Sequence, residues 1–163
     1  MSGWRIGQGI DAHRLVAGRA LVLGGVEIEY ERGLEGHSDG DVLLHAVADA
    51  VLGAAGLGDL GRHFPSSRED LRGADSSRLL AEAVALAREA GFAVGNVDAT
   101  VVAQVPRLAP WQEPMRAGVA RALGIEVERV NVKVTSTDGL GAMGRGEGIS
   151  ALAVVLLERS RGA

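Results

Sequence analysis

The chain has 163 residues, of which 47% are hydrophobic and 23% are charged, so its size and composition predict one compact globular domain. Its formal net charge of −4 provides no basic field for nucleic acid, and we expect no nucleic-acid partner. Cysteine is absent, which excludes disulfides and thiolate-bound metals. Aromatic residues make up only 3%, so the core consists of small aliphatic side chains. A core of that kind favours an oligomer whose interfaces bury more apolar surface.

The two ends of the chain carry no targeting or membrane signal. Residues 1–9 lack a basic region followed by an apolar run, and the apolar stretch 149–157 is too short to span a bilayer. We therefore expect a cytoplasmic protein that does not contact a membrane. No repeat, low-complexity segment or linker divides the sequence, so we expect a single catalytic domain over residues 1–163.

The N-terminal third of the chain predicts strands followed by a buried helix. Loose alternation predicts a strand over 4–10, and two apolar runs, 21–23 and 26–30, flank Gly24-Gly25 as in a hairpin. After a loop over 33–40, residues 41–52 are apolar around much of a helical turn, which indicates a largely buried helix. Ser38 or Asp39 is expected to cap its N-terminus.

The remainder of the chain alternates helices and strands. We expect two amphipathic helices ended by glycine, over 76–90 and 115–123, and three strands, over 97–105, 130–135 and 149–157, with a glycine-rich loop over 139–148. This mixed order predicts an α+β fold in which a mixed β-sheet is packed on one side by α-helices.

Three side chains form a candidate metal site. Asp11 and His13 lie two residues apart and face the same way on a strand, while His45 lies on the following helix. One aspartate and two histidines are a common ligand set for Zn²⁺ that leaves a position for substrate. Asp49, one turn after His45, is expected to accept the second ring N–H and fix the tautomer. The alternative is a solvated strand end together with an ordinary core histidine.

Three further polar clusters suit phosphate or a base, although each alone is also typical of ordinary loops. Residues 36–41 place glycines before a helix N-terminus, where an anion can bind, but a turn with a cap has the same pattern. Residues 133–138 and 144–148 bring hydroxyls, an ammonium and a guanidinium together, as a polar edge strand and loop also would. The loop 103–110 is a rigid proline turn whose backbone can contact a base edge.

These clusters occur together and in one order, and that combination is specific. Along essentially its whole length the chain resembles the 2-C-methyl-D-erythritol 2,4-cyclodiphosphate synthases. The segments that carry the resemblance are residues 6–13, 37–45, 52–61, 64–65, 96–100, 103–104, 131–133 and 144–148.

The resemblance implies a ferredoxin-like subunit that assembles as a homotrimer, with active sites between adjacent subunits. It implies Zn²⁺ on Asp11, His13 and His45, and Mg²⁺ on the diphosphate, reached from Asp138. The substrate-binding residues that it implies, some of which also bind metal, are Asp11, His13, His37, Ser38, Asp59, Leu60, Gly61, Phe64, Ala103, Gln104, Val105, Pro106, Arg107, Leu108, Ala109, Lys133, Thr135, Ser136, Thr137, Asp138, Ala142 and Arg145. Among them, His37, Asp59 and Ser136 are expected to act in catalysis.

Five positions depart from the usual family pattern. Ser136 stands where Thr is common and keeps the hydroxyl, while Asp138 stands where a longer Glu reaches Mg²⁺. Arg107 replaces a common Lys, Ser66 a frequent Asp, and Ala142 a bulky aromatic near the threefold axis. We therefore expect a shorter or water-mediated magnesium contact and a reshaped central cavity.

The implied reaction converts 4-diphosphocytidyl-2-C-methyl-D-erythritol 2-phosphate to 2-C-methyl-D-erythritol 2,4-cyclodiphosphate and CMP, in the non-mevalonate isoprenoid precursor pathway. A phosphorus-oxygen lyase of this kind relies on aligning anionic reactants and neutralising their charge. One alternative is a zinc-dependent phosphohydrolase with Asp59 or Asp49 as base. The other is a non-catalytic trimeric binder of isoprenoid phosphates through Arg145 and Glu147.

Overall fold

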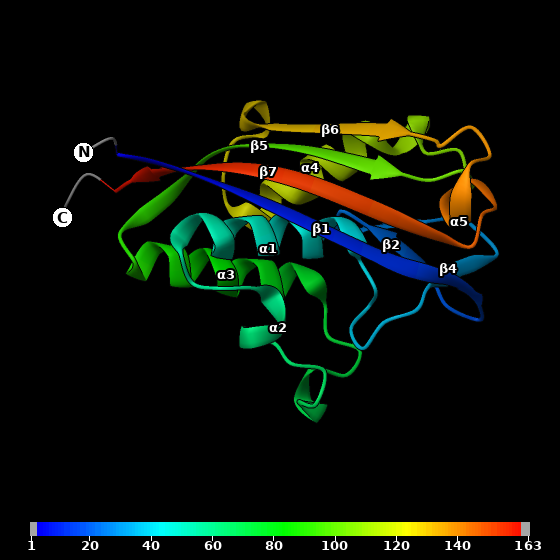
Figure 1. Ribbon diagram of the computed structural model, residues 1–163, viewed down its shortest axis with the longest axis horizontal. Coiled ribbons are helices and arrows are strands. Elements are labelled where there is room, and N and C mark those ends of the chain that lie inside the picture. The colour runs from blue at the N-terminus through cyan, green and yellow to red at the C-terminus, as the bar shows by residue number, and fades with distance from the viewer. Residues whose placement is uncertain (1–2, 161–163) are drawn as a thin grey trace.

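The computed structural model describes residues 3–160, and most of its strands form one five-stranded sheet (Figure 1). The strand order is β4-β1-β7-β5-β6, with β5 and β6 parallel and every other neighbouring pair antiparallel. A separate hairpin pairs β2 with β3. The strands are β1 (Trp4–Ala17), β2 (Leu21–Leu23), β3 (Val26–Ile28), β4 (Arg32–Leu34), β5 (Phe92–Val102), β6 (Val130–Thr135) and β7 (Gly148–Arg159).

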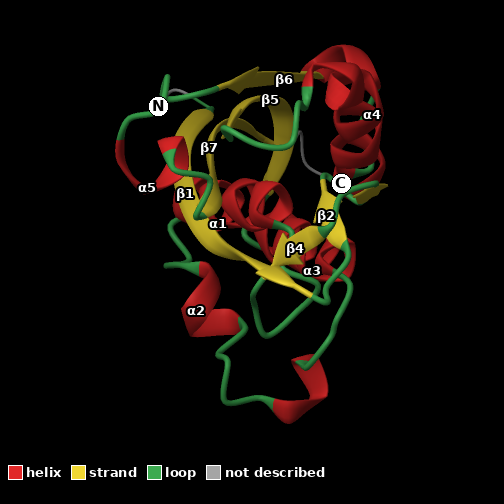
Figure 2. Ribbon diagram, turned by 90° about the vertical axis from the view of Figure 1, so that its right-hand side faces the viewer, coloured by secondary structure: helices red, strands yellow, loops and turns green. Residues whose placement is uncertain are grey.

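Helices pack against one face of the sheet, and Figure 2 shows the sheet curving around α1. The helices are α1 (Val42–Ala55), α2 (Leu60–His63), α3 (Ser76–Glu89), α4 (Gln112–Leu123) and α5 (Gly141–Gly144), with 3₁₀ turns at Glu69–Leu71, Ala109–Trp111 and Val127–Arg129. The predicted α+β class and the mixed sheet packed with helices are thereby confirmed. Within the described residues, none of the helices has the length and apolar character needed to traverse a bilayer.

Strand β1 presents two different faces because its side chains alternate. Gly7, Gly9 and Leu15 point toward the helices and are buried, and Asp11 and His13 follow on the same side. The opposite side carries apolar side chains in solvent: Trp4 is 65%, Ile6 74% and Ile10 66% exposed. Exposed apolar residues gathered on one sheet face are typical of surfaces that contact another molecule.

Helix α1 lies directly on the backbone of β1. A Cβ atom added to Gly9 would stand 2.0 Å from the carbonyl oxygen of Ala46, and one added to Gly7 would stand 2.0 Å from that of Ala50. Only glycine permits so close an approach. Because His45 precedes Ala46 on the helix, this contact also sets the distance between His45 and the ligands on β1.

The structure differs from the sequence-based expectations at several boundaries. Strand β1 continues seven residues beyond the expected end, to Ala17, and a short strand, β4, overlaps the start of the expected loop 33–40. The cap of α1 is Asp41, not Ser38 or Asp39: its carboxylate accepts the Leu44 N–H, 3.0 Å from that nitrogen, and also those of Gly24 and Gly25. The glycine-rich segment contains the single turn of α5.

Candidate metal centre and adjoining hollows

Asp11, His13 and His45 meet where β1 passes α1. The Asp11 Oδ2 atom lies 2.8 Å from His13 Nε2 and 2.9 Å from His45 Nδ1, and the two ring nitrogens are 3.2 Å apart. Among the described residues, this is the one group of three or more His, Asp or Glu side chains whose ligand atoms converge closely enough to hold a metal ion. His45 is buried, and the other two side chains are half-buried.

The cluster is electrostatically prepared for a positive charge. Burial opposes ionisation of Asp11, but hydrogen bonds with both imidazoles and their charge outweigh it and hold the pKa of Asp11 far below its usual range. The hydrogen bond to Asp11 raises the pKa of His13 against the opposing effect of burial. The ionised Asp11 carboxylate and the two ring nitrogens can thus also face a divalent cation.

The geometry of the three ligand atoms fits a small divalent ion. Ligands about 2.1 Å from a tetrahedral zinc ion are separated from one another by roughly 3.4 Å. The three separations here, between 2.8 and 3.2 Å, need only a small outward movement to reach that value. One carboxylate and two imidazoles can thus hold a metal ion and leave its fourth position open.

The outer nitrogen of His45 has different partners from those expected. His45 Nε2 lies 2.9 Å from Ser76 Oγ and 3.0 Å from Ser38 Oγ. Asp49, which we expected to accept this ring N–H, instead accepts the backbone N–H of Leu60, 2.9 Å from that nitrogen. The prediction for Asp49 was therefore wrong, because its carboxylate joins α1 to α2.

A hollow of about 210 Å³ adjoins the metal ligands. Its lining brings together His13, His37, Ser38, His45, Leu60, Phe64, Ser66, Leu71 and Leu79. His37 is held by a hydrogen bond from its Nε2 to the carbonyl of Arg68, 2.9 Å away. Asp59 and Gly61 flank the lining residue Leu60, and the Asp59 carboxylate caps α2 by accepting the Arg62 N–H, 2.8 Å away.

A second hollow, of about 220 Å³, lies where β5 and β6 end. It is lined by Ala103, Gln104, Pro106, Arg107, Leu108, Ala109, Val134, Thr135 and Ser136. Val105 belongs to the same loop and precedes Pro106 through a cis peptide bond. Lys133 faces away from the core, as expected, but its ammonium pairs with Asp98 at 2.7 Å.

The two hollows lie at the same end of the sheet. The register pairs Ala12 with Ser150, Ser150 with Val102, and Val102 with Thr135. Three strand spacings, from β1 across β7 and β5 to β6, separate the metal ligands from Thr135, a distance of roughly 14 Å. The two hollows share no lining residue, so one chain presents them as separate parts of one edge.

The glycine-rich segment adjoins the metal ligands from the other side. A hollow of about 180 Å³ is lined by Ala12, His13, Arg14, Ala142, Met143, Glu147 and Gly148. Arg145 extends into solvent and pairs with Glu147 at 2.5 Å. Ala142 therefore lies beside His13, whereas Arg145 does not line this hollow.

Asp138 is exposed and ordered by its neighbours. Its backbone has φ of 51°, in the left-handed region, and its N–H lies 3.2 Å from Ser136 Oγ. The Ser136 hydroxyl in turn donates to the Asp138 carboxylate over 3.1 Å. Thr137 closes the turn by donating its hydroxyl to the Leu140 carbonyl. The Asp138 carboxylate does not belong to the Asp11, His13 and His45 cluster.

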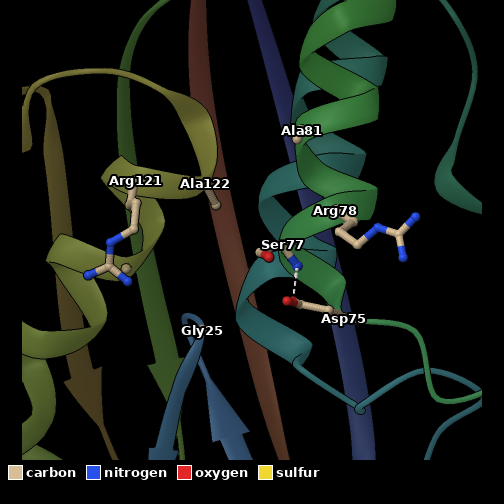
Figure 3. A pocket seen from close by; sticks show the side chains of 8 residues that line it. Gly25, Asp75, Ser77, Arg78, Ala81, Arg121 and Ala122 are labelled. Atoms are coloured by element: carbon tan, nitrogen blue, oxygen red, sulfur yellow. Dashed lines mark hydrogen bonds between the residues drawn. The ribbon is translucent and has the colours of Figure 1, made fainter.

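A further hollow, of about 370 Å³, contains none of the expected site residues. It lies between α3 and α4 and is lined by Gly25, Asp75, Ser77, Arg78, Ala81, Gly118, Arg121 and Ala122 (Figure 3). The figure shows Arg78 and Arg121 extending away from each other, so their charges do not converge on a common point. This hollow therefore adds nothing to the metal centre.

The contribution of Ser76 and Asp39 to the candidate centre is not evident from helical periodicity. Periodicity predicts Ser76 only as the start of a helix, yet this residue is 1% exposed and its hydroxyl lies 2.9 Å from His45 Nε2. A signal was available in the sequence. Asp75 can cap the helix by itself, so a serine directly after it is free to bond elsewhere.

Together, the fold and the site define an α+β protein with a His₂Asp metal-ligand cluster beside an open hollow, an arrangement that metal-dependent enzymes use. The family model described as the YgbB family matches residues 4–158. The chain therefore belongs to this family, whose similar members are named 2-C-methyl-D-erythritol 2,4-cyclodiphosphate synthases, and the resemblance noted from the sequence is confirmed.

Individual relatives are similar over most of the chain. The synthase of Geobacter metallireducens is 60% identical over 95% of this chain and 99% of its own length. A solved structure of the bifunctional IspDF from Campylobacter jejuni superposes with a TM-score of 0.92 at 42% identity, covering 96% of this chain and 42% of that one. A CDP complex of IspF from Plasmodium falciparum gives a TM-score of 0.85 at 32% identity, covering 99% of both chains.

Proposed function

We propose that this chain converts 4-diphosphocytidyl-2-C-methyl-D-erythritol 2-phosphate to 2-C-methyl-D-erythritol 2,4-cyclodiphosphate and releases CMP. The observation that carries the proposal is the Asp11, His13 and His45 cluster opening on a hollow in a chain of this family. Support also comes from relatives 60% identical that bear the synthase name. The activity is that of a phosphorus-oxygen lyase in the non-mevalonate isoprenoid precursor pathway.

The proposed reaction is an intramolecular phosphoryl transfer. An oxygen of the 2-phosphate forms a bond to the β-phosphorus, the bond from that phosphorus to the bridging oxygen breaks, and CMP leaves with the bridging oxygen. Because the attacking phosphate is already an anion, the protein needs to align the groups and offset their charge rather than remove a proton.

Asp11, His13 and His45 would hold the zinc ion in this proposal. When bound, zinc supplies positive charge that polarises phosphate oxygens and orients them. The first hollow would hold the methylerythritol portion, near His37, Ser38, Phe64 and the segment 59–61. Its lining of imidazole, hydroxyl and apolar side chains suits a small branched polyol phosphate.

The second hollow would hold the cytidine. Its rigid loop over residues 103–109 offers backbone groups to a base edge, and the adjacent Thr135 and Ser136 hydroxyls suit ribose or phosphate oxygens. A solved relative named as a CDP complex supports a cytidine nucleotide as the ligand. Lys133, Thr137 and Arg145 are proposed to support the phosphates from the same edge of the sheet.

Magnesium is proposed to act on the diphosphate and to be reached from Asp138, with His37, Asp59 and Ser136 as the residues closest to catalysis. An exposed carboxylate beside a hydroxyl turn suits Mg²⁺, which keeps most of its waters and takes one or two protein carboxylates. Ala142 remains a proposed contact beside His13.

We further propose a ferredoxin-like subunit, one catalytic domain over residues 1–163, that assembles in the cytoplasm as a homotrimer with sites between adjacent copies. Two features support the assembly. Large apolar side chains, including Trp4, Ile6 and Ile10, are exposed together on the uncovered face of β1. The two hollows also share no lining residue, as expected if each is completed by a neighbouring copy.

Incubation of the protein with the proposed substrate, zinc and magnesium tests the activity directly. Phosphorus NMR should reveal the paired resonances of a cyclic diphosphate together with CMP. Open-chain phosphates and CMP without the cyclic product would instead identify a phosphohydrolase. In the structure, the Asp49 and Asp59 carboxylates considered as the base of that alternative each accept a backbone N–H through one oxygen. Full biological activity in metal-stripped protein would instead identify a non-catalytic binder.

A further inference from the structure

The imidazole of His45 is engaged on both sides. Its Nδ1 atom points to the metal-ligand cluster, 2.9 Å from Asp11 Oδ2. Its Nε2 atom points the other way, into the protein, toward the hydroxyls of Ser76 at 2.9 Å and Ser38 at 3.0 Å. All three side chains are buried: His45 is 9%, Ser38 6% and Ser76 1% exposed.

The direction of the hydrogen bonds follows from the contact between Ser76 and Asp39. Ser76 Oγ lies 2.5 Å from Asp39 Oδ1, and a carboxylate oxygen cannot donate, so the hydroxyl hydrogen must lie between them. With its hydrogen committed to Asp39, the Ser76 oxygen can only accept from the imidazole. His45 Nε2 therefore carries a hydrogen, and Nδ1, which faces Asp11, is the ring nitrogen left to bind a metal ion when the ion replaces the Nδ1–H···Asp11 hydrogen bond.

Ser38 is less suited to this role, although it lies equally near. Its oxygen already accepts the N–H of Gly40, 3.2 Å away, and also lies 3.3 Å from Ser76 Oγ. Within the described residues no carboxylate contacts the Ser38 hydroxyl, so its hydrogen is not directed away from the imidazole as that of Ser76 is. The two serines thus carry the same hydroxyl group, but only the hydrogen of the Ser76 hydroxyl is directed to a carboxylate.

Asp39 also fixes where Ser76 stands. Its second oxygen accepts the Ser76 backbone N–H over 3.1 Å, and the Asp39 N–H donates to the Ala74 carbonyl over 3.0 Å. The carboxylate therefore binds both the N–H and the O–H of Ser76 and joins the loop before α1 to the first turn of α3. Helix α3 keeps a separate cap, because the Asp75 carboxylate accepts the Ser77 N–H.

We propose that Ser76, held by Asp39, is a positioning residue that sets the tautomer and orientation of His45 for metal binding. The chain of hydrogen bonds runs from His45 Nε2–H to Ser76 and from the Ser76 hydroxyl to the Asp39 carboxylate. Groups in this outer position typically change metal affinity 10- to 100-fold when they are removed. The inference rests on the proposed metal site and names the residues that tune it.

The test measures zinc dissociation constants by chelator competition for the wild type and four variants, without substrate. Ser76→Ala removes the acceptor while Asp75 still caps α3, and Asp39→Asn removes the charge behind it. Ser76→Thr restores a hydroxyl. Ser38→Ala is the matched control, because it removes the other hydroxyl at the same ring nitrogen.

We expect Ser76→Ala and Asp39→Asn to weaken zinc binding at least about tenfold, Ser38→Ala less than about threefold, and Ser76→Thr to recover most of the affinity. Nitrogen-15 NMR of wild-type zinc protein should show His45 protonated on Nε2, with slow solvent exchange that Ser76→Ala accelerates.

The outcomes separate this inference from the proposed metal site. Unchanged zinc affinity in Ser76→Ala, or an equal loss in Ser38→Ala, would overturn the role of Ser76 while leaving the metal site standing. Absence of zinc binding in the wild type would overturn both. Unfolding temperatures of the metal-free variants provide the check on folding: a purely structural serine would lower them without changing the zinc dissociation constant of the folded protein.

Discussion

Replacing Gly9 by alanine should separate α1 from β1 and disable the metal centre. An added Cβ would stand 2.0 Å from the Ala46 carbonyl oxygen and 2.8 Å from the Ala50 nitrogen, and both atoms are backbone. A side-chain rotation cannot relieve such a contact. The helix must instead move outward by more than about 1 Å to reach ordinary van der Waals distance.

The expected cost of this change follows from two effects. Forcing extra volume into a packed contact costs about 1–3 kcal/mol, and we expect the upper end because the obstacle is backbone. His45 lies one residue before Ala46 and would move with the helix. Since metal–ligand distances must be kept to within about 0.2 Å, a movement of that size should weaken zinc binding far more than tenfold.

Gly53→Ala provides a matched control on the same helix. Gly53 is exposed, and its added Cβ would meet nothing closer than the Gln8 carbonyl oxygen at 4.0 Å. Alanine there should leave zinc binding unchanged and stabilise the helix by about 0.5–1 kcal/mol. Urea unfolding of the metal-free proteins and chelator competition measure the two effects. Wild-type stability and zinc affinity in Gly9→Ala would refute the reasoning.

Four other outcomes are expected. His45→Ala should abolish stoichiometric zinc, measured by metal analysis of the folded protein. Asp138→Asn should raise the magnesium concentration needed for turnover severalfold, because the negative charge is lost, without changing zinc content. The turn should be kept, because asparagine also accepts the positive φ of this position. Ile10→Asp should reduce the mass found by light scattering from trimer toward monomer, since Ile10 is 66% exposed on the uncovered sheet face. The hydrogen bond from Lys133 lowers the pKa of Asp98, so the ionised carboxylate stabilises the fold. Asp98→Asn should therefore lower the free energy of unfolding by less than about 1 kcal/mol at neutral pH. The difference between variant and wild type should disappear as the pH falls below about 4 and Asp98 becomes protonated.

Each expectation has an outcome that contradicts it. Zinc retained in His45→Ala would remove the proposed site. Equal turnover of wild type and Asp138→Asn at limiting magnesium would remove the role of that carboxylate. A monomeric wild type at micromolar concentration would exclude the trimer. A stability difference for Asp98→Asn that persists at pH 2 would mean that the ion pair is not its source.

Alternation along a strand predicted part of the candidate metal site, because it fixes which side chains face together. Asp11 and His13 had to share a face, and His45 had to lie on the helix that follows. Periodicity could not predict the distance between α1 and β1, which depends on Gly7 and Gly9 allowing direct backbone contact. The family resemblance, rather than any local pattern, connected the three ligands.

The outer partners of His45 could not be predicted from spacing along one helix. Asp49 was expected because it follows His45 by one turn, yet the neighbour in space is Ser76, 31 residues away. That contact depends on how α3 returns beside α1, which is a tertiary arrangement. The cap of α1 was missed for a similar reason, because Asp41 also gathers two N–H groups from the distant β2–β3 turn.

Because side chains alternate along β1, the strand should tolerate a deletion less well than a substitution. Deleting one residue between Gly7 and Asp11 would keep the strand paired but exchange its two faces. If the part of β1 after the deletion changes face, Asp11 and His13 turn toward solvent. Ile10 can then take the place of Gly9 against the backbone of α1, where only a hydrogen atom fits. A substitution at an outward position of β1 therefore changes the exposed apolar face alone, whereas a change of register would disturb that face and the proposed metal ligands together.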